Sequence, residues 1–188
     1  MGIRNYLIAG VSGAGKTSVC NELQRRGYHA IHGDRELAYQ GDPETGIPTD
    51  GATPANQDKA VTFFSEHHIW HIDKVRALAA QQDAAVTFFC GGSRNFSRFI
   101  DLFDGVFVLD VDLETSLRRI HERAALDPTD WGGIPSERVI IRRLHQTQEG
   151  ISTNGIMTDT AAPIVDVVDE ILHHIEAMSA DHSNWRAL

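Results

Sequence analysis

Long apolar runs are missing from this sequence. None approaches the roughly 20 consecutive residues that a membrane-spanning helix needs, and the first residues already turn polar at Arg4 and Asn5, unlike a secretory signal peptide. Basic residues are also few, 17 against 26 acidic ones, so the formal net charge is −9. This balance argues against a nucleic-acid or membrane surface as partner, because both require a basic face. A small anionic ligand held by a local basic cluster remains compatible with it.

Cysteine is scarce as well. The chain has only Cys20 and Cys90, which do not form a C-x-x-C metal pattern and lie in apolar stretches. This favours reduced, buried thiols and a cytoplasmic location. The remaining composition is ordinary, with 41% hydrophobic and 23% charged residues over 188 positions. We therefore expect one globular domain over residues 1–188, acting as a monomer or homodimer.

Short apolar runs alternate with longer helical patterns along the chain, which predicts an α/β fold around a buried parallel sheet. The predicted strands are residues 6–9, 29–32, 85–90, 105–110 and 155–158. The predicted helices are residues 16–26, 54–80, 95–102, 113–124, 136–149 and 163–178. The long connections 34–53 and 126–135 are candidate binding or lid segments, the alternative being plain surface loops.

Residues 10–17, here called the phosphate loop, match the pattern G-x-x-x-x-G-K-[ST] completely. They follow a predicted strand and open a predicted helix. Their glycines let successive backbone N–H groups converge on a phosphate, and the helix N-terminus adds partial positive charge. Lys16 can reach the β- and γ-phosphates of ATP, and the Thr17 hydroxyl can hold Mg²⁺. The predicted nucleotide-binding residues are Gly10, Ser12, Gly13, Ala14, Gly15, Lys16, Thr17 and Ser18.

Asp34 follows the second predicted strand. The carboxyl ends of parallel strands line the ligand crevice of an open sheet, so we expect Asp34 to face the phosphate loop. There it can accept the proton of an attacking hydroxyl, orient that hydroxyl, or hold Mg²⁺ through water. The simpler alternative is an aspartate that caps a helix or turn. Arg35 and Glu36 are either substrate contacts or a solvated pair.

The predicted strand 85–90 ends in a turn, residues 91–95, that begins with two glycines. Glycines let a ligand approach the backbone, and Arg94 in this turn offers a planar fork for a phosphate or carboxylate, unless it is an ordinary surface arginine. A Walker B acid normally ends such a strand, but Cys90 stands there. Asp110 and Asp112 are candidate substitutes for the Walker B acid or, alternatively, helix caps.

Arg119 and Arg123 are four residues apart and share a face of the helix before the connection 126–135. Basic helix faces around a glycine-containing loop suit a lid that neutralises charge on a transferred phosphoryl group. The alternative is two solvated helix faces paired with neighbouring glutamates. Further on, Thr160 and Ala162 lie in a stretch of small residues that leaves a flat slot for a purine ring.

Histidines and aromatic residues crowd the predicted helix 54–80. His67 and His71 have the i, i+4 spacing of a metal pair, but no third ligand and no H-E-x-x-H pattern accompanies them. We expect instead a mixed core and pocket wall, in which Phe64 or Trp70 stacks on a planar acceptor.

Taken in order, these pieces resemble the nucleoside and nucleoside-monophosphate kinase group of P-loop proteins, which includes shikimate and gluconate kinases, over nearly the whole chain. The resemblance implies a three-layer α/β/α P-loop NTPase fold with a five-stranded parallel sheet of order 2-3-1-4-5 and a short lid. It implies ATP and Mg²⁺ as cofactors, an acceptor-binding region at residues 35–80 and a lid region at residues 119–143.

The resemblance also implies roles for single residues. Asp34 resembles the acid that activates the acceptor hydroxyl, and Arg94 lies at the position of the substrate-binding arginine. Arg119 and Arg123 resemble the lid arginines. Residues 159–163, with Thr160 and Ala162, are similar to the loop that holds adenine.

Two departures from the group's pattern narrow the choice of acceptor. Cys90 stands where members that phosphorylate nucleotides usually carry an acid, and His32 rather than a second acid lies two places before Asp34. Both favour a kinase that transfers the γ-phosphoryl group to a hydroxyl of a nucleoside-like compound. They argue against a nucleoside-monophosphate kinase and against a shikimate kinase. A phosphotransferase of the chloramphenicol or gluconate kinase type is an alternative. The non-kinase alternative is a nucleotide-binding ATPase or switch, which usually needs a clear Walker B acid.

Overall fold

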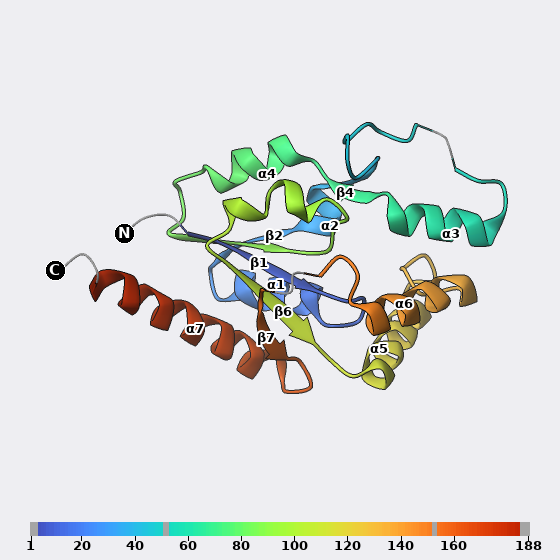
Figure 1. The fold of residues 1–188 in the computed structure, drawn as a ribbon. Coiled ribbons are helices and arrows are strands. Elements are labelled where there is room, and N and C mark those ends of the chain that lie inside the picture. Colours follow the sequence, from blue (N-terminus) through green and yellow to red (C-terminus); the bar gives the residue numbers. More distant parts are fainter. Residues whose placement is uncertain (1–3, 51–52, 152–153, 185–188) are drawn as a thin grey trace.

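The main sheet has five parallel strands in the order β2-β5-β1-β6-β7 (Figure 1). The structure is a computed structural model and describes residues 4–50, 53–151 and 154–184. The strands are β1 (Arg4–Gly10), β2 (His29–His32), β5 (Val86–Cys90), β6 (Gly105–Asp110) and β7 (Ile156–Asp159). Counted within this sheet alone, the order is 2-3-1-4-5, which confirms the prediction.

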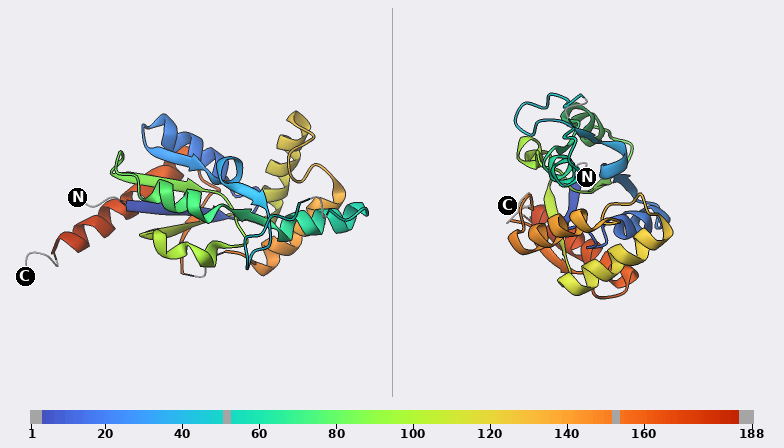
Figure 2. Two further views of the ribbon diagram at one scale, coloured as in Figure 1. Left: turned by 90° about the horizontal axis from the view of Figure 1, so that it is seen from above. Right: turned by 90° about the vertical axis from the view of Figure 1, so that its right-hand side faces the viewer.

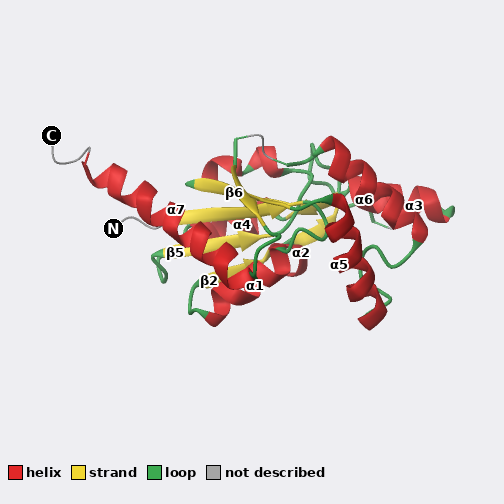
Figure 3. Cartoon of the chain, turned by 90° about the horizontal axis from the view of Figure 1, so that it is seen from below, coloured by secondary structure: helices red, strands yellow, loops and turns green. Residues whose placement is uncertain are grey.

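The sheet lies between two layers of helices (Figures 2 and 3). The main covering helices are α1 (Lys16–Arg25), α4 (Ile72–Ala79) and α7 (Ile164–Asn184). Successive side chains of β1 point to opposite faces. Tyr6 and Ile8 pack in the core with α1 and α7, whereas Leu7 and Ala9 pack in the core with α4. The fold is therefore the expected three-layer α/β/α arrangement.

The predicted helix over residues 54–80 is wrong. This stretch forms α3 (Gln57–Glu66), then β4 (His68–Trp70), then α4. The strand β4 pairs antiparallel with β3 (Ala38–Gln40), which lies in the connection predicted as a loop. The helical pattern was misleading because a strand of three residues has no periodicity of its own and forms only where a partner strand is available.

The connection 34–53 also begins inside a short helix, α2 (Gly33–Glu36), and its residues 51–52 lie outside the described part of the chain. The predicted helix 95–102 is instead two turns of 3-10 helix, Phe96–Arg98 and Ile100–Leu102. The other predicted helices form, and their ends differ from the prediction by a few residues.

Two helices, α5 (Leu113–Leu126) and α6 (Pro135–Thr147), project together from one end of the sheet (Figure 1). Asp112 caps α5, because its Oδ1 accepts the N–H of Thr115 at 2.8 Å. The helix α6 packs against α3, so the candidate lid and the candidate acceptor region meet. Within the described ranges no helix is long and apolar enough to cross a membrane. Cys20 and Cys90 are buried free thiols, as predicted.

Candidate active site

A cavity of about 820 Å³ opens at the carboxyl ends of β1, β2 and β5, between the phosphate loop, α3 and the α5–α6 pair. Its position agrees with the rule that open α/β sheets bind ligands at this edge. The predicted site residues that line it are Gly10, Ser12, Gly13, Gly15, Lys16, Thr17, Ser18, Asp34, Phe64, Arg94, Arg119 and Arg123.

The phosphate loop has a backbone that only glycine accommodates easily. Gly13 and Gly15 have φ angles of 81° and 101°, in the left-handed region that L side chains rarely adopt. A Cβ on Gly13 would also lie 2.7 Å from the carbonyl oxygen of Ser116. The helix α1 begins directly after the loop, at Lys16. The loop therefore leads directly into a helix N-terminus, whose partial positive charge favours an anionic phosphate. Ala14 is buried and does not line the cavity.

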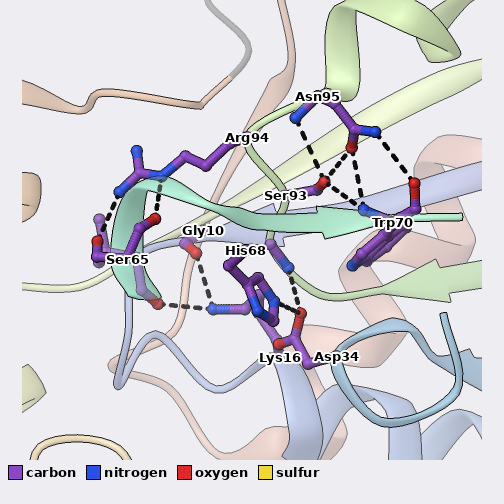
Figure 4. Close-up of polar contacts among 11 residues, drawn as sticks. Gly10, Lys16, Asp34, Ser65, His68, Trp70, Ser93, Arg94 and Asn95 are labelled. Carbon is purple, nitrogen blue, oxygen red and sulfur yellow. Dashed lines mark hydrogen bonds and ion pairs between the residues drawn. The ribbon is translucent and has the colours of Figure 1, made fainter. Parts of the chain in front are cut away.

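Lys16 folds back onto its own loop. Its Nζ donates to the carbonyl oxygens of Gly10 at 2.8 Å and Val11 at 3.0 Å (Figure 4). Burial lowers the pKa of Lys16, the carboxylate of Asp34 opposes this shift, and the charge of Arg123 adds to it. These three charged groups therefore act on the same part of the cavity.

Asp34 is held through one of its two carboxylate oxygens. The N–H of Gly92 donates to Oδ1 at 2.8 Å, and Nε2 of His68 lies 3.3 Å from the same atom (Figure 4). Burial alone would raise the pKa of Asp34. The His68 hydrogen bond, the charge of Lys16 and the Gly92 N–H outweigh it and leave the pKa below its usual value. The side chain therefore stands ionised in the cavity and does not act as a helix cap.

The aromatic residues of the predicted acceptor region have different environments. Trp70 is fully buried, with its ring stacked on Phe99 and edge-on to Phe96. The expectation that Trp70 stacks on an acceptor is therefore wrong, because neither face of its ring is open. Phe64 lines the cavity and is 38% exposed. The ring of Trp70 instead forms the floor beneath Gly91, where an added Cβ would lie 2.5 Å from it.

Arg94 lines the cavity, but much of its hydrogen-bonding capacity is already used. Its Nε donates to the carbonyl oxygen of Ser65 at 2.7 Å and its NH2 donates to the Ser65 hydroxyl at 3.0 Å (Figure 4). Its NH1 lies 3.8 Å from the Glu149 carboxylate, and burial lowers its pKa. Arg94 therefore joins the turn after β5 to α3 and to the segment after α6, and its contact with a substrate stays a prediction.

Arg119 and Arg123 line the cavity at different places. Arg119 donates to the carbonyl oxygens of Thr160 at 2.7 Å and Gly13 at 3.4 Å, and so connects the phosphate loop to the segment after β7. Arg123 forms an ion pair with Asp130 at 2.6 Å inside the predicted lid region. Thr160 and Ala162 do not line this cavity, and their contact with adenine also stays a prediction.

Sequence reasoning gave no site role to His68 or Gln40, although both line the cavity. The sequence pattern places His68 in a helix, and Gln40 lies in a segment without a pattern, so no local signal marks either residue. The Oε1 atom of Gln40 is buried without a hydrogen-bond partner in the described ranges. Arg35 also lines the cavity, whereas Glu36 turns away to accept the N–H of His32 at 2.8 Å.

Oxygen atoms suited to Mg²⁺ come from Thr17 and Asp34, which both line the cavity. Mg²⁺ is a hard cation that proteins usually bind through one or two side chains together with substrate phosphates. The described residues hold no cluster of three or more His, Cys, Asp or Glu side chains that suits a metal ion. The rings of His67 and His71 stack instead on Phe63 and Tyr39, respectively.

The two aspartates predicted as substitutes for an acid at Cys90 lie outside the cavity. Asp112 caps α5, and hydrogen bonds to Thr115 contribute to a pKa below its usual value. Asp110 accepts the N–H of Val111, the next residue.

Comparison with known proteins places the chain in a family. A family model described as an AAA domain matches residues 7–145, whereas no curated protein matches the chain. A gluconokinase from Sinorhizobium meliloti 1021 has a similar structure, with a TM-score of 0.57 and 19% identity over 98% of both chains. Shikimate kinase from Acinetobacter baumannii, in complex with shikimate, gives a TM-score of 0.59 and 18% identity over 93% of this chain and 94% of that one.

A deoxyadenosine kinase from M. mycoides gives a TM-score of 0.53 and 14% identity, covering 92% of this chain and 99% of that one. At such low identity these three likenesses concern the fold. The family match extends over most of the chain and includes the phosphate loop. The chain therefore belongs to the AAA domain family and has the α/β P-loop fold found in these small-molecule kinases.

Proposed function

We propose that the protein is an ATP-dependent kinase that transfers the γ-phosphoryl group to a hydroxyl of a nucleoside-like small molecule. The observation that carries this proposal is the arrangement of Lys16 and Asp34. Both line one cavity, with the phosphate loop on one side and the open ring of Phe64 in its wall. A group that can hold the donor and a group that can accept a hydroxyl proton therefore share one enclosed space.

On the donor side, the backbone N–H groups of residues 10–17 would hold the phosphates of ATP. Lys16 would exchange its hydrogen bonds to the carbonyl oxygens of Gly10 and Val11 for phosphate oxygens. The Thr17 hydroxyl would hold Mg²⁺, which when bound neutralises phosphate charge, and a contact of Asp34 with the ion would run through water.

In the transfer step, the acceptor oxygen attacks the γ-phosphorus and a new O–P bond forms. The bond between the γ-phosphorus and the bridging oxygen breaks, and ADP leaves. The hydroxyl proton passes to Asp34. Because the pKa of this carboxyl is lowered, it is a weak base that orients the hydroxyl and takes its proton late, which suits the loose transition state of phosphoryl transfer. Arg119 and Arg123 would offset the charge that spreads over the transferred group.

On the acceptor side, the cavity has an apolar wall built from two elements. Phe64 comes from α3, whereas Ile141 and Leu144 come from α6. A planar ring can stack on an exposed aromatic face, and such pairs contribute about 0.5–1.5 kcal/mol beyond the area they bury. This wall favours a nucleoside-like acceptor over a polyhydroxy compound.

Arg35 supports a second candidate. It lines the cavity one residue after Asp34, so it can bind the carboxylate of a sugar acid. A kinase of the gluconate type is therefore the second proposal, and the two acceptors are distinguished by the same assay.

The experiment is a screen of acceptors by ADP release. Purified protein, ATP and Mg²⁺ are mixed with nucleosides, nucleoside monophosphates, sugars, sugar acids, aminoglycosides or chloramphenicol-like compounds, and products are identified by mass spectrometry. We expect acceptor-dependent ADP release and a phosphorylated nucleoside. ADP release that no acceptor increases would identify an ATPase and refute the kinase. A nucleoside diphosphate formed from a monophosphate would identify the nucleotide kinase alternative.

We further propose that the protein works in the cytoplasm on a small-molecule acceptor, as a monomer or homodimer. The buried free thiols Cys20 and Cys90 and the acidic net charge of −9 support this assignment. Light scattering of the purified chain at several concentrations measures its oligomeric state directly.

A further inference from the structure

The strand β4 is fastened to the turn after β5 at both of its ends. The N–H of Arg94 donates to the carbonyl oxygen of His68 at 2.9 Å. At the other end, the N–H of Trp70 donates to Ser93 Oγ and Asn95 Oδ1, both at 3.1 Å, and Nδ2 of Asn95 donates to the Trp70 carbonyl at 3.0 Å (Figure 4).

These hydrogen bonds are difficult to break. Ser93 and Asn95 are 6% and 1% exposed, so separating them from β4 would leave buried polar groups without partners, at a cost of about 1–3 kcal/mol for each group. The backbone of His68 therefore has a defined place relative to the turn that carries Gly92. The two donors to Asp34, the Gly92 N–H and Nε2 of His68, therefore come from β4 and the turn after β5, which these hydrogen bonds hold together.

The two carboxylate oxygens of Asp34 consequently differ. Oδ1 receives the N–H of Gly92 and lies 3.3 Å from Nε2 of His68. Over the described residues, Oδ2 has no hydrogen-bond partner. The carboxylate also lies close to Gly91, where an added Cβ would be 2.6 Å from Oδ1.

We propose that His68 is a positioning residue, which holds Oδ1 of Asp34 so that Oδ2 is the oxygen that meets the acceptor hydroxyl and receives its proton. This inference rests on the proposed kinase function. The terminal torsion of aspartate is broad and roughly two-fold, so one donor leaves the carboxylate free to pivot. Two donors from different segments, Gly92 and His68, restrict that rotation. The neutral ring with its proton on Nε2 is sufficient for this role.

The test compares His68→Ala with His68→Gln, because the amide N–H of glutamine can replace the donor whereas alanine cannot. His121→Ala is the matched control, since His121 is exposed on α5 and does not line the cavity. We expect His68→Ala to lower kcat about 10-fold, the effect of about one hydrogen bond, with the KM for ATP changed by less than about two-fold. His68→Gln should recover most of kcat, and His121→Ala should match the wild type.

A double-mutant cycle with Asp34→Asn shows whether His68 acts through Asp34. We expect His68→Ala to cause no further loss of kcat in the Asp34→Asn background. Denaturant unfolding of the same four proteins should show coupling between the two positions, and this readout needs no acceptor.

Three results would overturn the role of His68. They are an unchanged kcat in His68→Ala, an equal loss in both His68 variants, and a full further loss in the Asp34→Asn background. Absence of coupling in the unfolding cycle would overturn it as well, even if no acceptor is found. A wild-type protein that phosphorylates no acceptor at all contradicts the proposed function, which is a different outcome.

Discussion

Arg94 binds Ser65 through two hydrogen bonds, from Nε to the carbonyl oxygen at 2.7 Å and from NH2 to the hydroxyl at 3.0 Å. Ser65 lies in the last turn of α3 and Arg94 lies in the turn after β5, so one guanidinium holds α3 to the end of a sheet strand. We expect Arg94→Ala to lower the free energy of unfolding by about 1–3 kcal/mol in denaturant titrations. Ser65→Ala, which removes only the hydroxyl, should lower it less.

The same variants separate the structural role of Arg94 from a substrate contact. If Arg94→Ala raised the KM for the acceptor and left the stability unchanged, Arg94 would be a substrate ligand and not a fastening residue.

Asp34→Asn should remove phosphoryl transfer and keep ATP binding. Asparagine has the same shape and can still accept the N–H of Gly92, but it cannot take a proton from the acceptor. We expect kcat to fall by about 10²-fold or more, in the range for a lost general base. Calorimetric ATP affinity should change by a few-fold at most. Asp73→Asn on the exposed face of α4 is the control, and a kcat for Asp34→Asn close to wild type would exclude the proton-acceptor role.

Lys16→Ala should abolish turnover and leave the fold intact. Among the described residues, the Nζ of Lys16 donates to carbonyl oxygens of its own loop, so its loss removes no hydrogen bond to another element of the fold. The phosphates, however, would lose their charged partner. ADP release should drop to background, with an unchanged circular dichroism spectrum. Lys74→Ala on α4, outside the cavity, is the control. Unchanged ATP consumption in the presence of acceptor would refute the assignment of Lys16.

Gly91→Ala and Gly92→Ala form a matched pair. A Cβ on Gly91 would lie 2.5 Å from the Trp70 ring and 2.6 Å from Asp34 Oδ1, whereas a Cβ on Gly92 would meet nothing within 4 Å. We expect Gly91→Ala to lower the free energy of unfolding by about 1–3 kcal/mol and to impair transfer, because Asp34 must move. Gly92→Ala should behave nearly like the wild type. Equal effects of the two substitutions would show that the floor of the site is not tightly packed.

Glu22 links stability to acid pH. Hydrogen bonds from Arg25 and then Arg26 lower its pKa from 4.5 to about 2. A carboxyl whose pKa is depressed by folding contributes stability that is present above pH 4.5 and is lost as the pH falls through about 2. Glu22→Gln should therefore flatten the decline in stability between these pH values, measured as the urea midpoint. A urea midpoint that falls with decreasing pH as steeply in Glu22→Gln as in the wild type would contradict this role.

The site could be predicted only in part from the sequence, and the residues show why. The phosphate loop is eight consecutive positions whose chemistry is local, so its pattern and its context identified it before any fold was known. Asp34 was found because it ends a strand that the apolar pattern predicts. The sequence places Trp70 in a helix because the three-residue strand that contains it has no periodicity of its own to interrupt the helical pattern.

Apolar periodicity and local motifs determined the strands of the main sheet, the phosphate loop and the acid at the end of the second strand, because each depends on neighbouring residues. Only the tertiary structure decided that β4 pairs with β3, that Trp70 is buried, and that His68 reaches Asp34. The reason is physical: β4 is held by Ser93 and Asn95 from a distant turn, and pairings between distant segments leave no periodic trace in either segment.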